Sequence, residues 1–220
     1  MKKFPATEKL YGEYTQKITS LVNELENRNL LKLENYEQSD LYLDKVLARI
    51  SLSGTVIDKW QDIITEGRFQ EFLEITKQFE LNGQDITHTY GTMIILQILD
   101  ITETIRNILL VLIDVEKLNP KINKTDTLST LLKKLNENSL FQLKDIFNEE
   151  LRIALAHAKW YFQNNVFYFK VDKPKEEIKS YSIVDMFKAH HNIALFLRCL
   201  NDVGLVYAIQ IREKKRPAKS

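Results

Sequence analysis

An arginine and a histidine stand five residues apart in the otherwise helix-forming stretch 148–162. Arg152 carries a permanent positive charge and a planar fork of donors that suits a phosphate. His157 can take up or release a proton near neutral pH, as a general acid or base must. Two such side chains are a minimal set for cleaving an RNA backbone without a metal ion. The pair is therefore the first candidate catalytic site.

The predicted helix does not by itself bring these two side chains together. Residues five apart on an ideal helix are offset by ~140°, so Arg152 and His157 do not share a face. The expected buried stripe consists of Leu143, Phe147, Leu151, Ala154 and Ala158. In the alternative interpretation neither residue is catalytic: His157 is half-buried and Arg152 is solvated. The pair can act together if the helix ends early or if a second copy of the chain supplies the missing partner.

Three other polar side chains are weaker candidates. Glu150 lies seven residues before His157, on the same side of the helix, and is a candidate to orient the imidazole. Its alternative role is that of a solvent-facing acid. His190 and His191 are adjacent, point ~100° apart on a helix and have no evident third ligand. We therefore expect surface positions for both histidines, and no metal or cofactor.

An aromatic hairpin is predicted directly after the Arg–His segment. Two aromatic and β-branched runs within residues 160–171 flank Asn164 and Asn165, a pair that suits a tight turn. Trp160 and Tyr161 are candidates to stack on RNA bases, although alternating aromatic residues of a hairpin often belong to the core. Because both faces of this hairpin carry aromatic residues, we expect one face to cover a partner or ligand.

The rest of the chain has mainly helical patterns. Apolar residues at three- and four-residue steps predict the longest helix at 87–118, about 45 Å long. Asn119 and Pro120 should end it, because proline lacks a backbone donor. Ser182, followed three positions later by Asp185, predicts the start of the last helix. This last helix is predicted to cover residues 182–211. The remaining predicted helices cover residues 7–27, 40–50, 56–66, 68–79, 127–135 and 139–159.

Composition favours a packed, mainly α protein. The 220 residues are 44% hydrophobic and include only 6 Gly and 4 Pro. A formal net charge of +1 gives no overall field that would attract nucleic acid or membrane, so such a contact needs a local patch. The most hydrophobic stretch, 93–113, carries too many polar residues for hydrocarbon. The single cysteine, Cys199, fits a reducing compartment. We expect a soluble, cytoplasmic protein with no membrane segment.

Residues around the Arg–His pair resemble those of HEPN-domain proteins (higher eukaryotes and prokaryotes nucleotide-binding). The resemblance is carried by Leu151-Arg-Ile-Ala-Leu-Ala-His-Ala-Lys-Trp160, followed by the aromatic hairpin and a closing helix. The family signature is an arginine, a short spacer and a histidine, late in a helical bundle. Arg152, four intervening residues and His157 match it. The likeness is clearest over about residues 139–211.

The helical patterns, the basic C-terminal residues and the resemblance together predict the fold, and the resemblance alone implies the function. The fold is mainly α: a HEPN-like helical bundle at 86–211 with one short aromatic β-hairpin after the motif helix, an N-terminal helical region at 1–85 packed on the bundle, and a basic flexible tail at 212–220. The function is that of a metal-independent endoribonuclease of toxin or antiviral defence type. A homodimer would bring two Arg–His pairs to one cleft for RNA, with an antitoxin or other protein as a further partner.

The same resemblance assigns a role to each catalytic candidate. His157 would assist proton transfer while a 2′-hydroxyl attacks the adjacent phosphate. Arg152 would stabilise the charge that grows on the phosphoryl oxygens. Active members commonly have a polar residue directly after the arginine, where this chain has Ile153. A non-catalytic HEPN-like binding or assembly module is therefore the second hypothesis, so whether the protein is an enzyme stays open. A helical interaction protein with an accidental motif match is the third.

Overall fold

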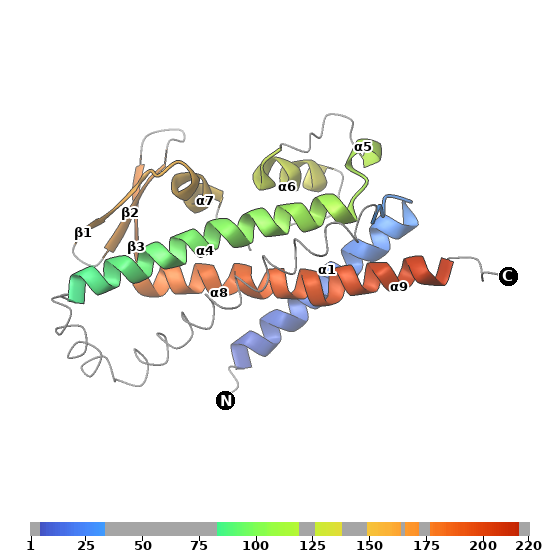
Figure 1. Ribbon diagram of the computed structural model, residues 1–220, viewed down its shortest axis with the longest axis horizontal. Coiled ribbons are helices and arrows are strands. Elements are labelled where there is room, and N and C mark those ends of the chain that lie inside the picture. Colours follow the sequence, from blue (N-terminus) through green and yellow to red (C-terminus); the bar gives the residue numbers. More distant parts are fainter. Residues whose placement is uncertain are drawn as a thin grey trace. The chain divides into compact units, whose positions relative to one another are not determined.

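The described part of the chain is predominantly helical and includes one small antiparallel sheet, in agreement with the predicted mainly α class (Figure 1). The computed structural model describes residues 5–33, 83–118, 126–137, 149–163, 166–171 and 177–215. The helices predicted at 40–50, 56–66 and 68–79 lie outside these ranges. Most of region 1–85 lies outside them too, so the division at residue 85 remains a prediction.

The described elements form two compact units. The first unit contains α1 (Pro5–Asn27), α5 (Val115–Leu118), α6 (Leu128–Glu137), the π-helix η1 (Leu200–Leu205) and α9 (Val206–Lys215). The second contains α7 (Glu149–Ala156) and the strands β1 (Trp160–Gln163), β2 (Val166–Val171) and β3 (Glu177–Ser182). Two long helices, α4 (Gly83–Leu112) and α8 (Ile183–Cys199), each contribute residues to both units.

The core of the first unit follows the predicted apolar stripes. On α1 the buried side chains are Tyr14, Ile18, Leu21, Val22 and Leu25, and on the last part of α4 they include Ile101, Ile105, Leu109 and Leu112. Helix α1 packs against η1 and α9. An ideal Cβ on Gly204 would lie only 3.0 Å from the Ile18 side chain. The missing side chain of Gly204 therefore lets η1 approach α1 closely.

Cys199 and Tyr14 are buried where α8 meets α1 in the first unit. The Tyr14 and Phe196 rings meet edge to face, with centroids 5.6 Å apart. The Cys199 Sγ lies 3.8 Å from the Tyr11 carbonyl oxygen. Burial raises the pKa of Tyr14 to about 12 and the pKa of the Cys199 thiol to about 11. Both groups are therefore neutral packing residues at physiological pH.

The longest helix ends earlier than predicted. Helix α4 stops at Leu112, and α5 follows after Ile113, which forms an isolated antiparallel bridge with Leu31. The carbonyl oxygens of Val111 and Leu112 accept bonds from the backbone N–H groups of residues 33 and 32, at 3.1 and 2.9 Å. These bonds satisfy the last carbonyls of α4, which have no partner within the helix. The sequence pattern does not contain this long-range pairing.

The last helical region is a continuous helical segment that contains one π-helical stretch. Ser182 and Asp185 cap its start as predicted: the Ser182 N–H donates to Asp185 Oδ2 (3.1 Å) and the Asp185 N–H donates to Ser182 Oγ (3.2 Å). The Ser182 hydroxyl also donates to Asp185 Oδ2, at 2.7 Å. This bond, together with the one from the Ser182 N–H, lowers the pKa of Asp185. Helix α8 then continues through η1 into α9, which extends to Lys215. The basic tail predicted from residue 212 therefore begins within a helix, and residues 216–220 lie outside the described ranges.

Within the described residues, one helix is long and apolar enough to cross a membrane: the segment Asp185–Lys214 of this last helical region. Its mean hydropathy is 1.4 over an 18-residue window. In the structure 44% of that window is buried. A core helix of a soluble protein has the same properties. The feature is therefore only a weak sign of a membrane span.

The second unit contains a sheet of three strands in the order β1-β2-β3. The predicted hairpin is confirmed, because β1 and β2 pair antiparallel from Trp160↔Phe169 to Gln163↔Val166. The third strand was not predicted, and the expectation of a single hairpin is corrected. Strand β3 pairs with β2 along its whole length. Its sequence, EIKSYS, is mostly polar because most of this strand is exposed.

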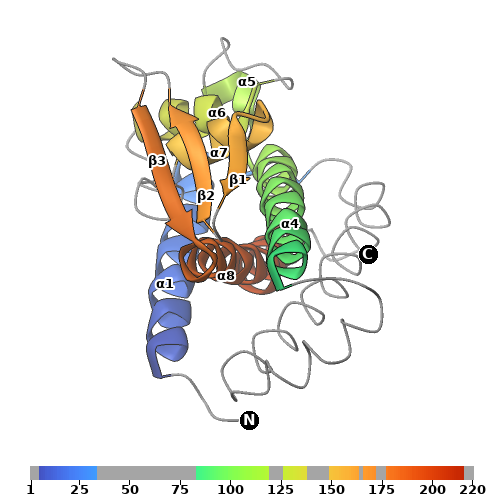
Figure 2. The ribbon, with the colours of Figure 1, turned by 90° about the vertical axis from the view of Figure 1, so that its left-hand side faces the viewer.

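The two faces of this sheet differ in burial. The register places on the inner face Trp160, Phe162, Phe167, Phe169, Val171, Glu177, Lys179 and Tyr181. Of these, Phe167, Phe169 and Val171 are buried. Helix α7 packs against β2, and in Figure 2 it lies behind the sheet. The register places on the outer face Tyr161, Gln163, Val166, Tyr168, Lys170, Ile178, Ser180 and Ser182, all of which are exposed or half-buried.

A glycine allows α4 to approach the inner face. An ideal Cβ on Gly91 would lie 1.8 Å from Phe167 Cζ, a distance that no real contact permits. Phe167 is completely buried, so its ring has little room to move. Contact between helix and sheet in this unit therefore requires glycine at position 91.

A buried polar pair joins α4 to α8 in the same unit. His190 Nε2 lies 2.6 Å from Gln97 Oε1, and their side chains belong to residues only 7% and 6% exposed. The surface position predicted for His190 is wrong, whereas His191 is exposed as predicted. Burial, with a smaller contribution from the charge of His191, lowers the pKa of His190 to about 4. The imidazole is therefore neutral at physiological pH.

We predict that Gly91→Ala destabilises the protein by about 2 kcal/mol, because the overpacking cost exceeds the gain in helix propensity of about 1 kcal/mol. Urea unfolding would measure the change. Gly12→Ala is the matched control, since Gly12 is exposed on α1 and an ideal Cβ there would have no described atom within 4 Å. That variant should gain about 0.5–1 kcal/mol. Equal stabilisation by both alanines would contradict the close contact.

We also predict a pH-dependent loss of stability from His190. The pKa of His190 in the folded state, about 4, lies below its value in the unfolded state. The contribution of neutral His190 to the free energy of unfolding is therefore complete above about pH 6.5 and is lost as the pH falls towards 4. The loss should be roughly 3 kcal/mol. Unfolding free energies measured from pH 7 to 4 should show this loss in the wild type and in His191→Gln, but a flatter dependence in His190→Gln. Parallel curves for wild type and His190→Gln would refute the assignment.

Candidate functional site

Helix α7 ends within the predicted Arg–His segment. It was predicted to extend to about residue 159 but stops at Ala156; its predicted start at 139 lies outside the described ranges. The Ala158 N–H donates to the Leu155 carbonyl at 3.1 Å, and the Lys159 N–H to the Ala154 carbonyl at 2.8 Å. This pair of bonds is a Schellman motif. Ala158 adopts the required left-handed conformation, with φ of 52°.

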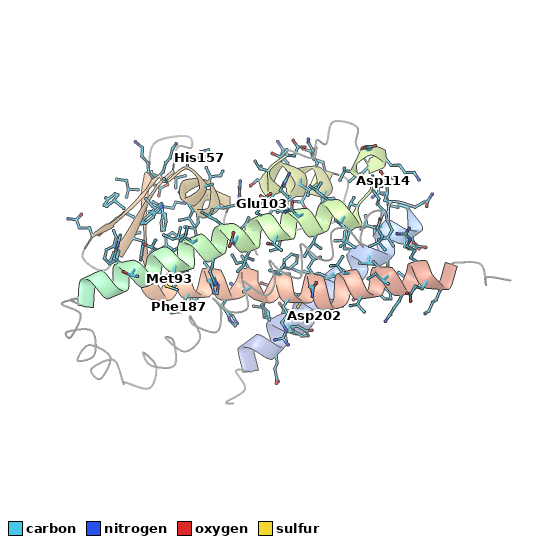
Figure 3. The ribbon with its side chains drawn as sticks, in the orientation of Figure 1. Met93, Glu103, Asp114, His157, Phe187 and Asp202 are labelled. Atoms are coloured by element: carbon cyan, nitrogen blue, oxygen red, sulfur yellow. The ribbon has the colours of Figure 1, made fainter. Side chains whose placement is uncertain are left out.

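The early end of α7 separates the environments of the two catalytic candidates. Arg152 is half-buried within the helix, and its Nε atom is buried. His157 is exposed at the helix end, where Figure 3 places it beside the sheet. Its backbone N–H still donates to the Ile153 carbonyl at 3.1 Å. The imidazole is therefore held by an ordered backbone and is accessible to a substrate, whereas Arg152 has less exposed surface.

Leu151, Ala154 and Leu155 form the buried side of α7. The first two belong to the predicted stripe, but Ala158 is exposed because the Schellman turn takes it off the helix. The half-buried Arg152 and exposed His157 reverse the expectation of a solvated arginine and a half-buried histidine. Within one chain, only His157 of the two residues is readily accessible to a substrate.

Glu150 contacts a different residue from the one expected. Its carboxylate forms an ion pair with Lys179 of β3, and this hydrogen bond raises the pKa of Lys179. The pair connects the start of α7 to the sheet. An orienting contact with His157 is not among the described contacts of Glu150, so that role stays a prediction.

The two stacking candidates face opposite sides of the sheet. Trp160 belongs to the inner face, with its ring 6.0 Å from Phe167 and 6.4 Å from His88 of α4. Its ring is therefore engaged within the protein. Tyr161 belongs to the outer face, is 46% exposed and stacks on Tyr168 with ring centroids 5.0 Å apart and planes at 13°. Of the two, Tyr161 is the one whose ring a base can reach.

Two lysines near this ring were not singled out from the sequence. The Lys170 N–H donates to the Lys159 carbonyl at 2.9 Å, which extends the β1–β2 ladder by one pair beyond Trp160↔Phe169. The backbones of Lys159 and Lys170 thus lie beside each other, and Lys170 belongs to the outer face with Tyr161 and Tyr168. The two-residue period of the sequence on either side of residues 164 and 165 could have predicted that Lys170 shares a face with Tyr168.

No cluster of three or more His, Cys, Asp or Glu side chains within the described ranges could hold a metal ion. Cys199 is buried, and His190 is hydrogen-bonded to Gln97. The ionisable groups described on α7, at its end or paired with it include Glu150, Arg152, His157, Lys159 and Lys179. Any chemistry at this helix would therefore rest on these side chains.

Comparison with known proteins places the chain in no family. No protein-family model, curated protein or solved structure matches it. The resemblance of residues 151–160 to HEPN-domain proteins therefore stays a prediction.

We predict that Ala158→Gly stabilises the protein by about 1 kcal/mol, because glycine adopts a positive φ without the steric cost that a Cβ imposes. Chemical denaturation would measure the gain. Ala156→Gly is the matched control, since Ala156 is an exposed residue inside α7, and it should lose about 0.5–1 kcal/mol. A loss of stability in both variants would show that α7 does not end in this motif.

Proposed function

We propose that this protein is a metal-independent endoribonuclease of the HEPN type, in which Arg152 and His157 act on an RNA phosphate. The observation that carries the proposal is the position of His157: exposed, at an ordered helix end, five residues after an arginine in the same helix. The Arg-x4-His spacing and the aromatic strands that follow it support the same assignment.

The reaction requires two proton transfers. A neutral His157 would remove the proton of a ribose 2′-hydroxyl as its oxygen attacks the adjacent phosphorus. The bond from phosphorus to the 5′-oxygen breaks, a protonated group supplies a proton to that oxygen, and the products carry 2′,3′-cyclic phosphate and 5′-hydroxyl ends. The guanidinium of Arg152 would stabilise the negative charge on the phosphoryl oxygens, an effect on the barrier of about 3 kcal/mol.

A homodimer would complete this site. One chain presents an exposed histidine but a half-buried arginine, and the two residues are offset by ~140° on an ideal helix. Two copies related by a two-fold axis can supply groups from different helix faces to one cleft. The second histidine would then be the group that protonates the 5′-oxygen. In the toxin or defence role, a cognate antitoxin or other protein would control access to this cleft in the cytoplasm.

Two observations favour a non-catalytic module as the second candidate. Ile153 follows the arginine and has no polar group for a phosphate. The Arg152 Nε atom is buried, which limits how the guanidinium can face a substrate. In that case α7 and the sheet would serve binding or assembly in a HEPN-like bundle, and no RNA would be cut.

Cleavage of a mixed RNA panel by the purified protein in EDTA tests the proposal. We predict cleavage that leaves 2′,3′-cyclic phosphate ends and falls at least about a hundredfold in His157→Ala and Arg152→Ala, the loss expected for a general base or a charge-stabilising group. His191→Ala and Arg198→Ala are matched controls, because both residues are exposed on α8, and they should retain the wild-type rate. Growth inhibition on expression, relieved by the same two active-site substitutions, would be the cellular counterpart.

An inactive wild-type protein that forms a stable dimer would favour the binding or assembly module. Cleavage that persists in both alanine variants would place the activity elsewhere or in a contaminant. Folding of each variant is checked by its thermal unfolding curve.

A further inference from the structure

An ion pair joins the helix that carries Arg152 to the edge of the sheet. Glu150 lies in the first turn of α7, and its carboxylate pairs with the Lys179 ammonium on β3. The two residues are 29 positions apart in the chain, so the contact depends on the fold and not on a local pattern. The Glu150 and Lys179 side chains are 48% and 34% exposed. Solvent and salt therefore screen this pair only in part.

Helix α7 depends on tertiary contacts for its position. It is 8 residues long, whereas an isolated helix needs about 12–15 residues to be even marginally stable in water. Its buried side consists of Leu151, Ala154 and Leu155, and the helix packs against β2. Apolar contact is non-directional, so this packing alone does not fix the rotation of α7 about its axis. The ion pair supplies that direction, because a charged donor and its acceptor must meet at one place.

The rotation of α7 decides where Arg152 lies. Successive residues of a helix turn by ~100°, so Glu150 and Arg152 are ~160° apart around the axis and flank the buried side from opposite directions. When Lys179 holds Glu150 at β3, Arg152 is consequently fixed on the other flank. His157 directly follows the last residue of α7 and takes its position from the same helix.

We propose that Glu150 and Lys179 are positioning residues of the ribonuclease site, and that their ion pair fixes the rotation of α7 at which Arg152 meets the RNA phosphate. The inference rests on the proposed function. It gives Glu150 a role that reaches the reaction through Arg152 and differs from the predicted orientation of His157. Because salt screens a partly exposed pair, the same contact makes kcat sensitive to ionic strength.

The kinetics of RNA cleavage by single and double variants test this role. We expect Lys179→Met and Glu150→Gln each to lower kcat about tenfold with KM within twofold, because a small displacement of Arg152 weakens contacts made in the transition state. The double variant should be no slower than either single variant, since both substitutions remove the same contact. Lys179→Arg should keep kcat within twofold of the wild type, because a guanidinium can also pair with Glu150.

Glu13→Gln is the matched control. It breaks the ion pair between Lys9 and Glu13 on α1, whose side chains are 81% and 51% exposed, and it should leave kcat unchanged. Additive losses in the double variant of Glu150 and Lys179 would overturn the proposal, as would a Lys179→Arg variant that is as slow as Lys179→Met.

Amide hydrogen exchange tests the hold on α7 without any RNA. The His157 N–H donates to the Ile153 carbonyl at the end of this helix. Its exchange should be about fivefold faster in Lys179→Met and Glu150→Gln than in the wild type. Faster exchange in a protein that cuts no RNA would reject the ribonuclease and leave the pair as a contact that orders α7. RNA cleavage at the wild-type rate in all variants would reject the positioning role and retain the ribonuclease.

Discussion

The change from helix to strand within residues 157–159 is the constraint on which the candidate functional region depends. The left-handed Ala158 and the two Schellman bonds end α7. They leave His157 exposed and bring the chain to the start of β1 at Trp160. A helix that continued to residue 159, as the pattern predicted, would place Lys159 on the helix surface and remove its backbone bond to Lys170. One backbone conformation therefore positions both the histidine and the start of the sheet.

The sheet beyond this turn has different requirements on its two faces. The inner face is fixed by close packing: Phe167 and Phe169 are buried, and Gly91 allows α4 to reach them. That packing fixes the register, because a slip of one residue would exchange the two faces. The outer face is consequently presented in a defined order of side chains. Rigid support behind an accessible surface is what a binding face needs.

Periodic features of the sequence were predicted well. The buried residues of α1 and α4 recur at helical spacing, the cap at Ser182 and Asp185 is a local interaction, and the hairpin register follows from a two-residue turn. Features that depend on distant contacts were not. The pairing of residues 31–33 with the end of α4 shortened that helix, and burial of His190 depends on Gln97, a residue 93 positions earlier. The end of α7 was missed because alanine gives no signal for positive φ, and β3 because an exposed strand resembles a loop.

The buried thiol described between α1 and α8 has a practical consequence. Cys199 is the only cysteine in the chain, is fully buried, and has a pKa of about 11. Because the thiolate is the reactive form, alkylating dyes should leave it intact in the native protein. A cysteine introduced on an exposed position would then be the sole point of attachment for a fluorophore or spin label, without any need to replace the natural one.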